Sequence, residues 1–271
     1  MFFSWYKKFS SQPHQPFFTS GILFLILFMS LFVSVYSNFL VLDNSVLTYH
    51  AYTMVFVIFI QFFLGFLFVV FPRFLIQAEI QIQEYMKQFL LYFFASLGIF
   101  LTLIFYSKVT FIFQILMLIA QIMSFKLLYS IHKKSIVKVK EDTKWVLISL
   151  FSGLVFHSLF IISSLNFPYA YELSRFAIDG GFYLFLFMVI FVISQRMIPF
   201  FTTAKAPNYV ANKSVNLLTI IFSLLAFKVI LLAFDNAKLN LLADIPLFIM
   251  ITRELIKWKL PFFKVPAIMW V

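Results

Sequence analysis

The sequence predicts an all-α, polytopic transmembrane helical bundle with about eight visible spans. Of its 271 residues, 63% are hydrophobic and only 11% are charged, and a water-soluble domain of this size could not cover so much apolar surface. Several runs exceed the roughly 18 residues that an α-helix needs to cross a bilayer. Basic residues flank these runs, which lack the short alternation of polar and apolar residues that is typical of membrane β-barrels.

Eight apolar runs follow one another along the chain. We place spans at 17–37, 50–71, 89–106, 109–131, 145–167, 176–198, 215–234 and 239–256. The first run is long and lacks a small-residue cleavage site, so it is a span rather than a signal peptide. The eighth run is the least apolar, because four residues interrupt it: Asp244, Pro246, Arg253 and Glu254.

The segments between the runs are short. Segment 72–88 (PRFLIQAEIQIQEYMKQ) is amphipathic and is expected to lie at the membrane interface. Segment 132–144 (HKKSIVKVKEDTK) is strongly charged and predicts a solvated loop. Since there is no internal repeat and no loop long enough to fold alone, residues 1–271 are predicted to form a single membrane domain.

The chain closes on a new apolar stretch, LPFFKVPAIMWV, which contains an interfacial tryptophan. We expect a further span to begin there, so that the chain is truncated at its C-terminus and is part of a longer bundle.

The distribution of Lys and Arg predicts the orientation. With eight spans and an inner N-terminus, only Lys108, Arg175 and Lys238 fall in outer loops and Lys228 falls inside a span. The other 17 of the 21 basic residues lie on the inner side, as the positive-inside rule requires. We therefore expect a multi-pass membrane protein with a cytoplasmic N-terminus and the lipid bilayer as its main partner.

Several function classes are excluded. The net charge is +11, but the basic residues flank apolar spans, so the charge does not indicate a nucleic-acid partner. Without cysteine the chain has no disulfide, iron–sulfur cluster, thiolate haem ligand or cysteine nucleophile. No Walker A loop, Gly-x-Ser-x-Gly elbow or His-Glu-x-x-His motif is present.

His157, in LVFHSLF, is the most informative polar residue. It lies about 18 Å into the fifth span, near the middle of a hydrocarbon core about 30 Å thick. A histidine at this depth can be an axial haem ligand, a metal ligand or a proton relay. It can equally be a helix–helix contact that is hydrogen-bonded to Ser or Tyr.

His50, in TYHAYTM, opens the second span near the outer surface. It can be a ligand or an ordinary member of an interfacial aromatic belt. If both helices are regular, His50 and His157 differ in depth by about 12 Å. The two axial ligands of an upright haem need similar depths, so we do not expect these histidines to share one iron in that arrangement. They can serve two sites, or a tilted helix can close the gap in depth.

A few other polar groups fall within spans, where each needs a partner. They are Gln61, Gln114, Gln121, Asp179, Arg196, Lys228 and Asp244. Lys228 can snorkel to the outer surface or pair with Asp235 or Asp244. Asp179 precedes two glycines and can pair with Arg175, Lys228 or Lys238.

Three stretches, in this order, resemble motifs of the NnrS family of haem- and copper-containing membrane proteins. The stretches are HQPFFTSGILFLILF (14–28), YHAYTMVFVIFIQFFLGFLFVVFPRF (49–74) and SQRMIPFFT (194–202). The third, which is similar to the family's Gly-Gly-Arg-Val-Ile-Pro-Phe-Phe-Thr, is the most specific. Physically, Arg196 is an inner-face cation and Pro199 is expected to end the span.

The resemblance implies a haem-binding inner-membrane protein linked to the nitric oxide response or to denitrification. His50 and Met54 match the first histidine and the methionine of the family's His-Ala-His-Glu-Met. Tyr52 replaces the second histidine and Thr53 replaces the glutamate, which argues against a copper site that uses that histidine. Arg196 is the candidate partner of haem propionates, since a guanidinium pairs well with a carboxylate.

We thus expect haem as a cofactor, His50 and His157 as its candidate metal ligands, Arg196 as its anchor and nitric oxide as a ligand. The sequence does not decide whether the protein is an enzyme. One alternative is a solute transporter or permease-like protein without a cofactor, in which Gln114, Gln121, Lys228 and Asp244 line a path. Another is a non-catalytic membrane subunit that requires a partner protein.

Overall fold

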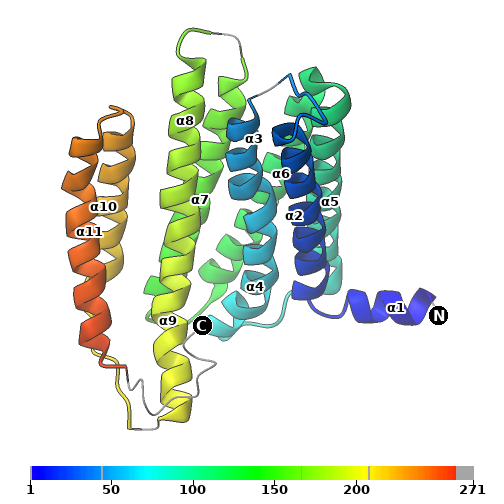
Figure 1. The fold of residues 1–271 in the computed structure, drawn as a ribbon. Coiled ribbons are helices and arrows are strands. Elements are labelled where there is room, and N and C mark those ends of the chain that lie inside the picture. Colours follow the sequence, from blue (N-terminus) through cyan, green and yellow to red (C-terminus); the bar gives the residue numbers. More distant parts are fainter. Residues whose placement is uncertain (1, 44, 166, 207, 261–271) are drawn as a thin grey trace.

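The computed structural model describes residues 2–43, 45–165, 167–206 and 208–260. These residues form a bundle of helices and contain no β-strand (Figure 1), so the predicted fold class is confirmed. The expected further span at the C-terminal end falls almost entirely on residues 261–271, outside the described residues.

Six helical segments in the described ranges are long and apolar enough to cross a membrane. They are α2 (His14–Tyr36); α3 (Val46–Thr53), continued by η1 (Met54–Ile58) and α4 (Phe59–Phe74); α5 (Ile82–Phe105); η2 (Ser107–Val109) with α6 (Thr110–Lys134); α7 (Glu141–Ser163); and α8 (Ala170–Gly180), continued by η3 (Gly181–Phe187) and α9 (Met188–Lys205). Successive segments run in opposite directions (Figure 1). We call the end at which α2 and α5 begin the basic end, because the lysine-rich connection between α6 and α7 lies there, and the opposite end the distal end.

The last two predicted spans form a hairpin beside α8, made of α10 (Leu217–Leu232) and α11 (Ala237–Trp258) (Figure 1). The 16 residues of α10 extend about 24 Å, which is shorter than a hydrocarbon core of about 30 Å. Five charged residues interrupt α11: Lys238, Asp244, Arg253, Glu254 and Lys257. The predicted count of eight spans is therefore too high by the criteria of length and apolarity, which six segments meet.

The outer surface of the bundle is apolar. Large side chains that are about half exposed or more include Ile22, Ile26, Val33, Phe94, Phe105 and Phe151. Lipid tails can solvate such side chains, whereas water would penalise so large a contiguous apolar surface. Together with the six long apolar helices, this surface identifies a multi-pass membrane protein. The short helix α1 (Phe2–Phe9), with Lys7 and Lys8 in its last turn, lies across the bundle axis at the basic end (Figure 1).

One sequence-based expectation about a helix end was wrong. Pro199 does not end its span, because α9 continues through it to Lys205. The amphipathic segment 72–88 is divided between the end of α4 at Phe74, a connection, and the start of α5 at Ile82. The continuous segment Ala170–Ala204 has 35 residues and is about 52 Å long, so one end extends well beyond a hydrocarbon core.

The segments η1 and η3 are π-helical and pack against each other. Gly181 begins η3, and a Cβ atom added there would lie 2.4 Å from Cζ of Phe56 in η1. The missing side chain is thus what allows the two segments to approach. Single π-turns leave backbone groups outside the regular α-helical pattern and often occur at functional sites, so this contact directs attention to the residues around Phe56.

We predict that Gly181→Ala destabilises the protein by about 1–3 kcal/mol, because the new methyl group must displace the buried ring of Phe56. The thermal unfolding midpoint in detergent should fall. Gly21→Ala is the matched control, since its Cβ would meet the ring of Phe62 at 3.0 Å and the partly buried ring can yield more easily. Equal midpoints for Gly181→Ala and the wild type would contradict the close packing of η1 on η3.

Candidate functional site

His157 lies on α7, fully buried, and both of its ring nitrogens have hydrogen-bond partners. Nε2 lies 3.0 Å from the hydroxyl of Tyr52 on α3, and Nδ1 lies 2.8 Å from Oε1 of Gln121 on α6. The amide nitrogen of Gln121 donates to the backbone carbonyl of Phe56 at 3.0 Å. Four elements of the bundle therefore meet at this histidine.

The direction of each hydrogen bond in this chain follows from its last member. A carbonyl can only accept, so Nε2 of Gln121 must donate to Phe56 and Oε1 of Gln121 must accept. Nδ1 of His157 then carries the proton that it donates to Oε1. An imidazole buried without a carboxylate partner is neutral, so Nε2 carries no proton and accepts the Tyr52 hydroxyl proton. We call Tyr52, His157, Gln121 and the Phe56 carbonyl the His157 chain.

The local helix geometry explains why the Phe56 carbonyl is available. Phe56 lies inside the π-helical segment η1, where the α-helical hydrogen-bond pattern is interrupted. A backbone carbonyl in a membrane interior needs a partner, and Gln121 supplies one.

Aromatic rings enclose the chain. The ring of Phe56 stacks on the imidazole with centroids 4.8 Å apart, and the ring of Phe160 stacks on Tyr52 at 4.3 Å. All of these side chains are buried. The stacking holds the imidazole and the phenol in fixed orientations, and it leaves the Nε2 lone pair of His157 directed at the Tyr52 hydroxyl.

His50 has very different surroundings. It is partly buried near the distal end of α3, and its ring packs edge-on against Phe32 of α2 at a centroid distance of 5.2 Å. Its Nδ1 atom is buried and has no hydrogen-bond partner among the described residues. Ser45 caps the start of α3 by accepting from the backbone nitrogen of Thr48, which fixes the turn that carries His50.

Arg196 lies on α9 toward the basic end. Its Nη1 atom donates to Oδ2 of Asp142 on α7 at 2.6 Å, and its guanidinium lies over the ring of Phe74, 4.1 Å from the centroid. Oδ1 of Asp142 accepts from Nε2 of Gln195 at 2.6 Å, and Oε1 of Gln195 accepts from Nζ of Lys213 at 2.8 Å. Burial lowers the pKa of the Lys213 ammonium below its ordinary value, and the nearby Asp142 carboxylate partly opposes this shift.

The structure does not bring the three predicted site residues together. His50 and Tyr52 are two residues apart on one helix, and they face α2 and α7 respectively, so His50 and His157 lie on opposite sides of α3. Arg196 contacts Phe74, which lies about 36 Å along the α3–α4 segment from His50. It also contacts Asp142, about 22 Å along α7 from His157.

Two further ion pairs lie apart from the two histidines. Lys228 of α10 binds Asp244 of α11 and lies 5.1 Å from the centroid of the Tyr183 ring. Arg175 pairs with Asp235 at 3.1 Å. Gln114 is fully buried on α6, where its amide group lies next to the Tyr49 hydroxyl. The four residues of the predicted transport path thus divide between the α6 interior and the α10–α11 hairpin.

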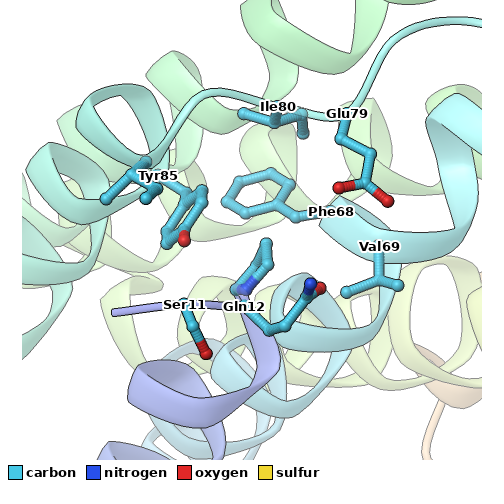
Figure 2. A pocket seen from close by; sticks show the side chains of 9 residues that line it. Ser11, Gln12, Phe68, Val69, Glu79, Ile80 and Tyr85 are labelled. Carbon is cyan, nitrogen blue, oxygen red and sulfur yellow. The ribbon is translucent and has the colours of Figure 1, made fainter. Parts of the chain in front are cut away.

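A cavity of about 180 Å³ lies at the basic end, between the start of α2, the end of α4 and the segment that leads into α5 (Figure 2). Tyr85 and Glu79 line it, and the Tyr85 hydroxyl donates to the backbone carbonyl of Ser10. None of His50, His157 and Arg196 lines this cavity.

Sequence reasoning missed the partners of the predicted residues. Tyr52 was noted only as a replacement of a family histidine, although a tyrosine two residues after His50 must point to another helix face. Asp142 was treated as part of a charged loop, yet it begins α7 and binds Arg196. The depth of Gln121 in its span was the one signal that could have linked it to His157.

A family model described as NnrS protein matches residues 8–271. No curated protein and no solved structure matches the chain.

We predict that Tyr52→Phe and Gln121→Leu both destabilise the protein, the second more strongly. Tyr52→Phe leaves one buried atom, Nε2 of His157, without a partner, which costs about 1–3 kcal/mol. Gln121→Leu leaves two, Nδ1 of His157 and the Phe56 carbonyl. Thermal unfolding in detergent measures the difference.

Tyr129→Phe is the matched control for Tyr52→Phe, because Tyr129 is half exposed and its hydroxyl makes no hydrogen bond with the described residues. The two chain substitutions should also be non-additive when combined, since both act on His157. Additive effects, or equal effects of Tyr52→Phe and Tyr129→Phe, would mean that the His157 chain does not act as a unit.

Proposed function

The chain belongs to the NnrS family, and from this we propose that it is a haem-binding protein of a bacterial inner membrane that acts in the response to nitric oxide or in denitrification-linked metabolism. Support comes from the motifs that resemble the family and from a multi-pass helical bundle in which one histidine has an unsatisfied ring nitrogen. Haem is the cofactor that the family resemblance implies, so its fit to each candidate histidine can be tested against the packing.

The surroundings of His157 do not fit a haem. An axial ligand must direct a free nitrogen lone pair at the iron. Both ring nitrogens of His157 are hydrogen-bonded, and Phe56 and Phe160 fill the adjacent space. Coordination there would require Tyr52 to leave, so we derive no role for haem at His157 and assign this residue to the hydrogen-bonded chain that joins α3, α6 and α7.

The surroundings of His50 do fit, and this is the observation that carries the proposal. Its imidazole is partly buried and makes no hydrogen bond with the described residues, and its Nδ1 atom is buried without a partner. An orphaned buried nitrogen is unfavourable unless another group satisfies it. His50 would supply the imidazole, Phe32 would support the ring from α2, and the Ser45 cap would fix the helix turn.

A bound haem would supply an iron atom that can take nitric oxide as a ligand. Arg196 cannot anchor the propionates of a haem at His50, because it contacts Phe74, which lies about 36 Å along the α3–α4 segment from His50. The argument against a copper site is unchanged by the fold. Tyr52 stands where the family has its second histidine, and its hydroxyl is hydrogen-bonded to His157.

The same proposal includes the orientation. The basic end, with Lys133, Lys134 and Lys140, faces the cytoplasm, and so does the N-terminal helix α1. We do not propose a transport path, because the polar residues that could line one are split between two parts of the bundle.

We predict that the full chain, purified in detergent after expression with added haem precursor, shows a Soret absorption band that shifts when nitric oxide is added. His50→Ala should reduce the haem content by roughly tenfold or more, because it removes the axial imidazole. The measurement is the optical spectrum together with a pyridine haemochromogen assay of bound haem.

His14→Ala and His132→Ala are the controls, since His14 begins α2 at the basic end and His132 binds Thr143 there. Neither should alter the band. The absence of any Soret band in the wild type would overturn the haem proposal, and a band that His50→Ala leaves unchanged would overturn the assignment of the ligand.

A further inference from the structure

A second cavity, of about 350 Å³, opens at the basic end between α4 and α9, and no part of the proposed haem function uses it. Its lining residues are Val70, Arg73, Phe74, Arg196, Met197 and Phe200. We propose that this cavity binds the phosphate group of an anionic phospholipid from the cytoplasmic leaflet.

Two guanidinium groups border the cavity, and both retain free donors. Arg196 uses Nη1 for Asp142, and stacking on Phe74 fixes the plane of its guanidinium, so its other N–H groups stay available in a preset orientation. Arg73 pairs with Glu79 at 3.0 Å, but both side chains are more than half exposed, so this pair is weak. A phosphate oxygen can therefore compete for both arginines.

The remaining lining is apolar and suits the glycerol backbone and the start of an acyl chain. Val70 lies one helical turn before Phe74 on α4, which places it deeper in the bundle than the two guanidinium groups. Met197 and Phe200 contribute the α9 side, and Phe200 is largely exposed. Val70 thus gives the cavity an apolar end on the bundle side of the two guanidinium groups, where the acyl chain of a phospholipid would begin. Met197 and Phe200 follow Arg196 toward the basic end and border the headgroup region.

The position of the cavity favours a lipid over a soluble anion. Basic pockets between transmembrane helices on the cytoplasmic side recur as sites for anionic lipid headgroups. The chain carries a net charge of +11, and the lysine-rich connection between α6 and α7 lies at the same end. Cations near an anionic leaflet raise the local concentration of such lipids.

The test uses the full chain in detergent and native mass spectrometry, with equal amounts of phosphatidylglycerol and phosphatidylcholine added. The wild type should retain phosphatidylglycerol preferentially and should unfold at a higher temperature in its presence. Arg73→Gln should lower phosphatidylglycerol occupancy by about fivefold, since one cation near the headgroup is lost. Because the Arg73 side chain is exposed, we expect this variant to fold like the wild type, which gel filtration and circular dichroism would verify.

Arg253→Gln is the matched control, because it removes the same charge from an exposed residue in the half of α11 nearer the basic end, away from the cavity. An equal loss of lipid in Arg253→Gln would show that net charge alone attracts the lipid and would overturn the site. Stabilisation by inorganic phosphate without retention of phosphatidylglycerol would overturn it as well. Neither result depends on haem, so this inference can fail while the proposed function stands.

Discussion

The bundle depends on satisfying polar groups inside an apolar interior. His157, Gln121 and the Phe56 carbonyl would each be costly if unpaired, and a single chain of hydrogen bonds satisfies all three. That chain ties α7 to α3, α6 and η1. The close contact of Gly181 with Phe56 then brings η3 against the same point. One polar chain, enclosed by stacked aromatic rings, therefore sets how the central helices meet.

The basic end is organised by a second set of polar contacts. The Asp142 carboxylate accepts hydrogen bonds from Arg196 and Gln195, and the side-chain oxygen of Gln195 accepts one from Lys213. These bonds join α7, α9 and the connection to α10. On α11, Glu254 accepts from the backbone nitrogen of Ser214. Because these contacts lie near the membrane surface, they can combine helix packing with exposed cationic groups. Arg196 belongs to this layer and not to the histidine region.

The separation of His50, His157 and Arg196 changes how the family motifs are interpreted. The His-Ala-Tyr stretch divides its side chains between two faces of α3: His50 faces α2 with an unsatisfied ring nitrogen, and Tyr52 faces α7 and binds His157. In the Arg-Met-Ile-Pro-Phe-Phe-Thr stretch, Arg196 binds Asp142, which lies about 22 Å along α7 from His157. The motifs therefore mark distinct places in the bundle, each with its own chemistry.

The sequence by itself determined the fold class, six of the eight predicted spans and the family, because long apolar runs, flanking cations and contiguous motifs are local features. It mispredicted a helix end at Pro199, whereas α9 continues through the proline to Lys205, because a transmembrane helix can tolerate a proline that would break an isolated one. Only the tertiary structure decided that His157 binds Tyr52 and Gln121, that His50 faces another helix, and that Arg196 pairs with Asp142. Those partners are 36 to 105 residues apart in sequence, and their meeting depends on helix rotation and on π-turns, which no local pattern encodes.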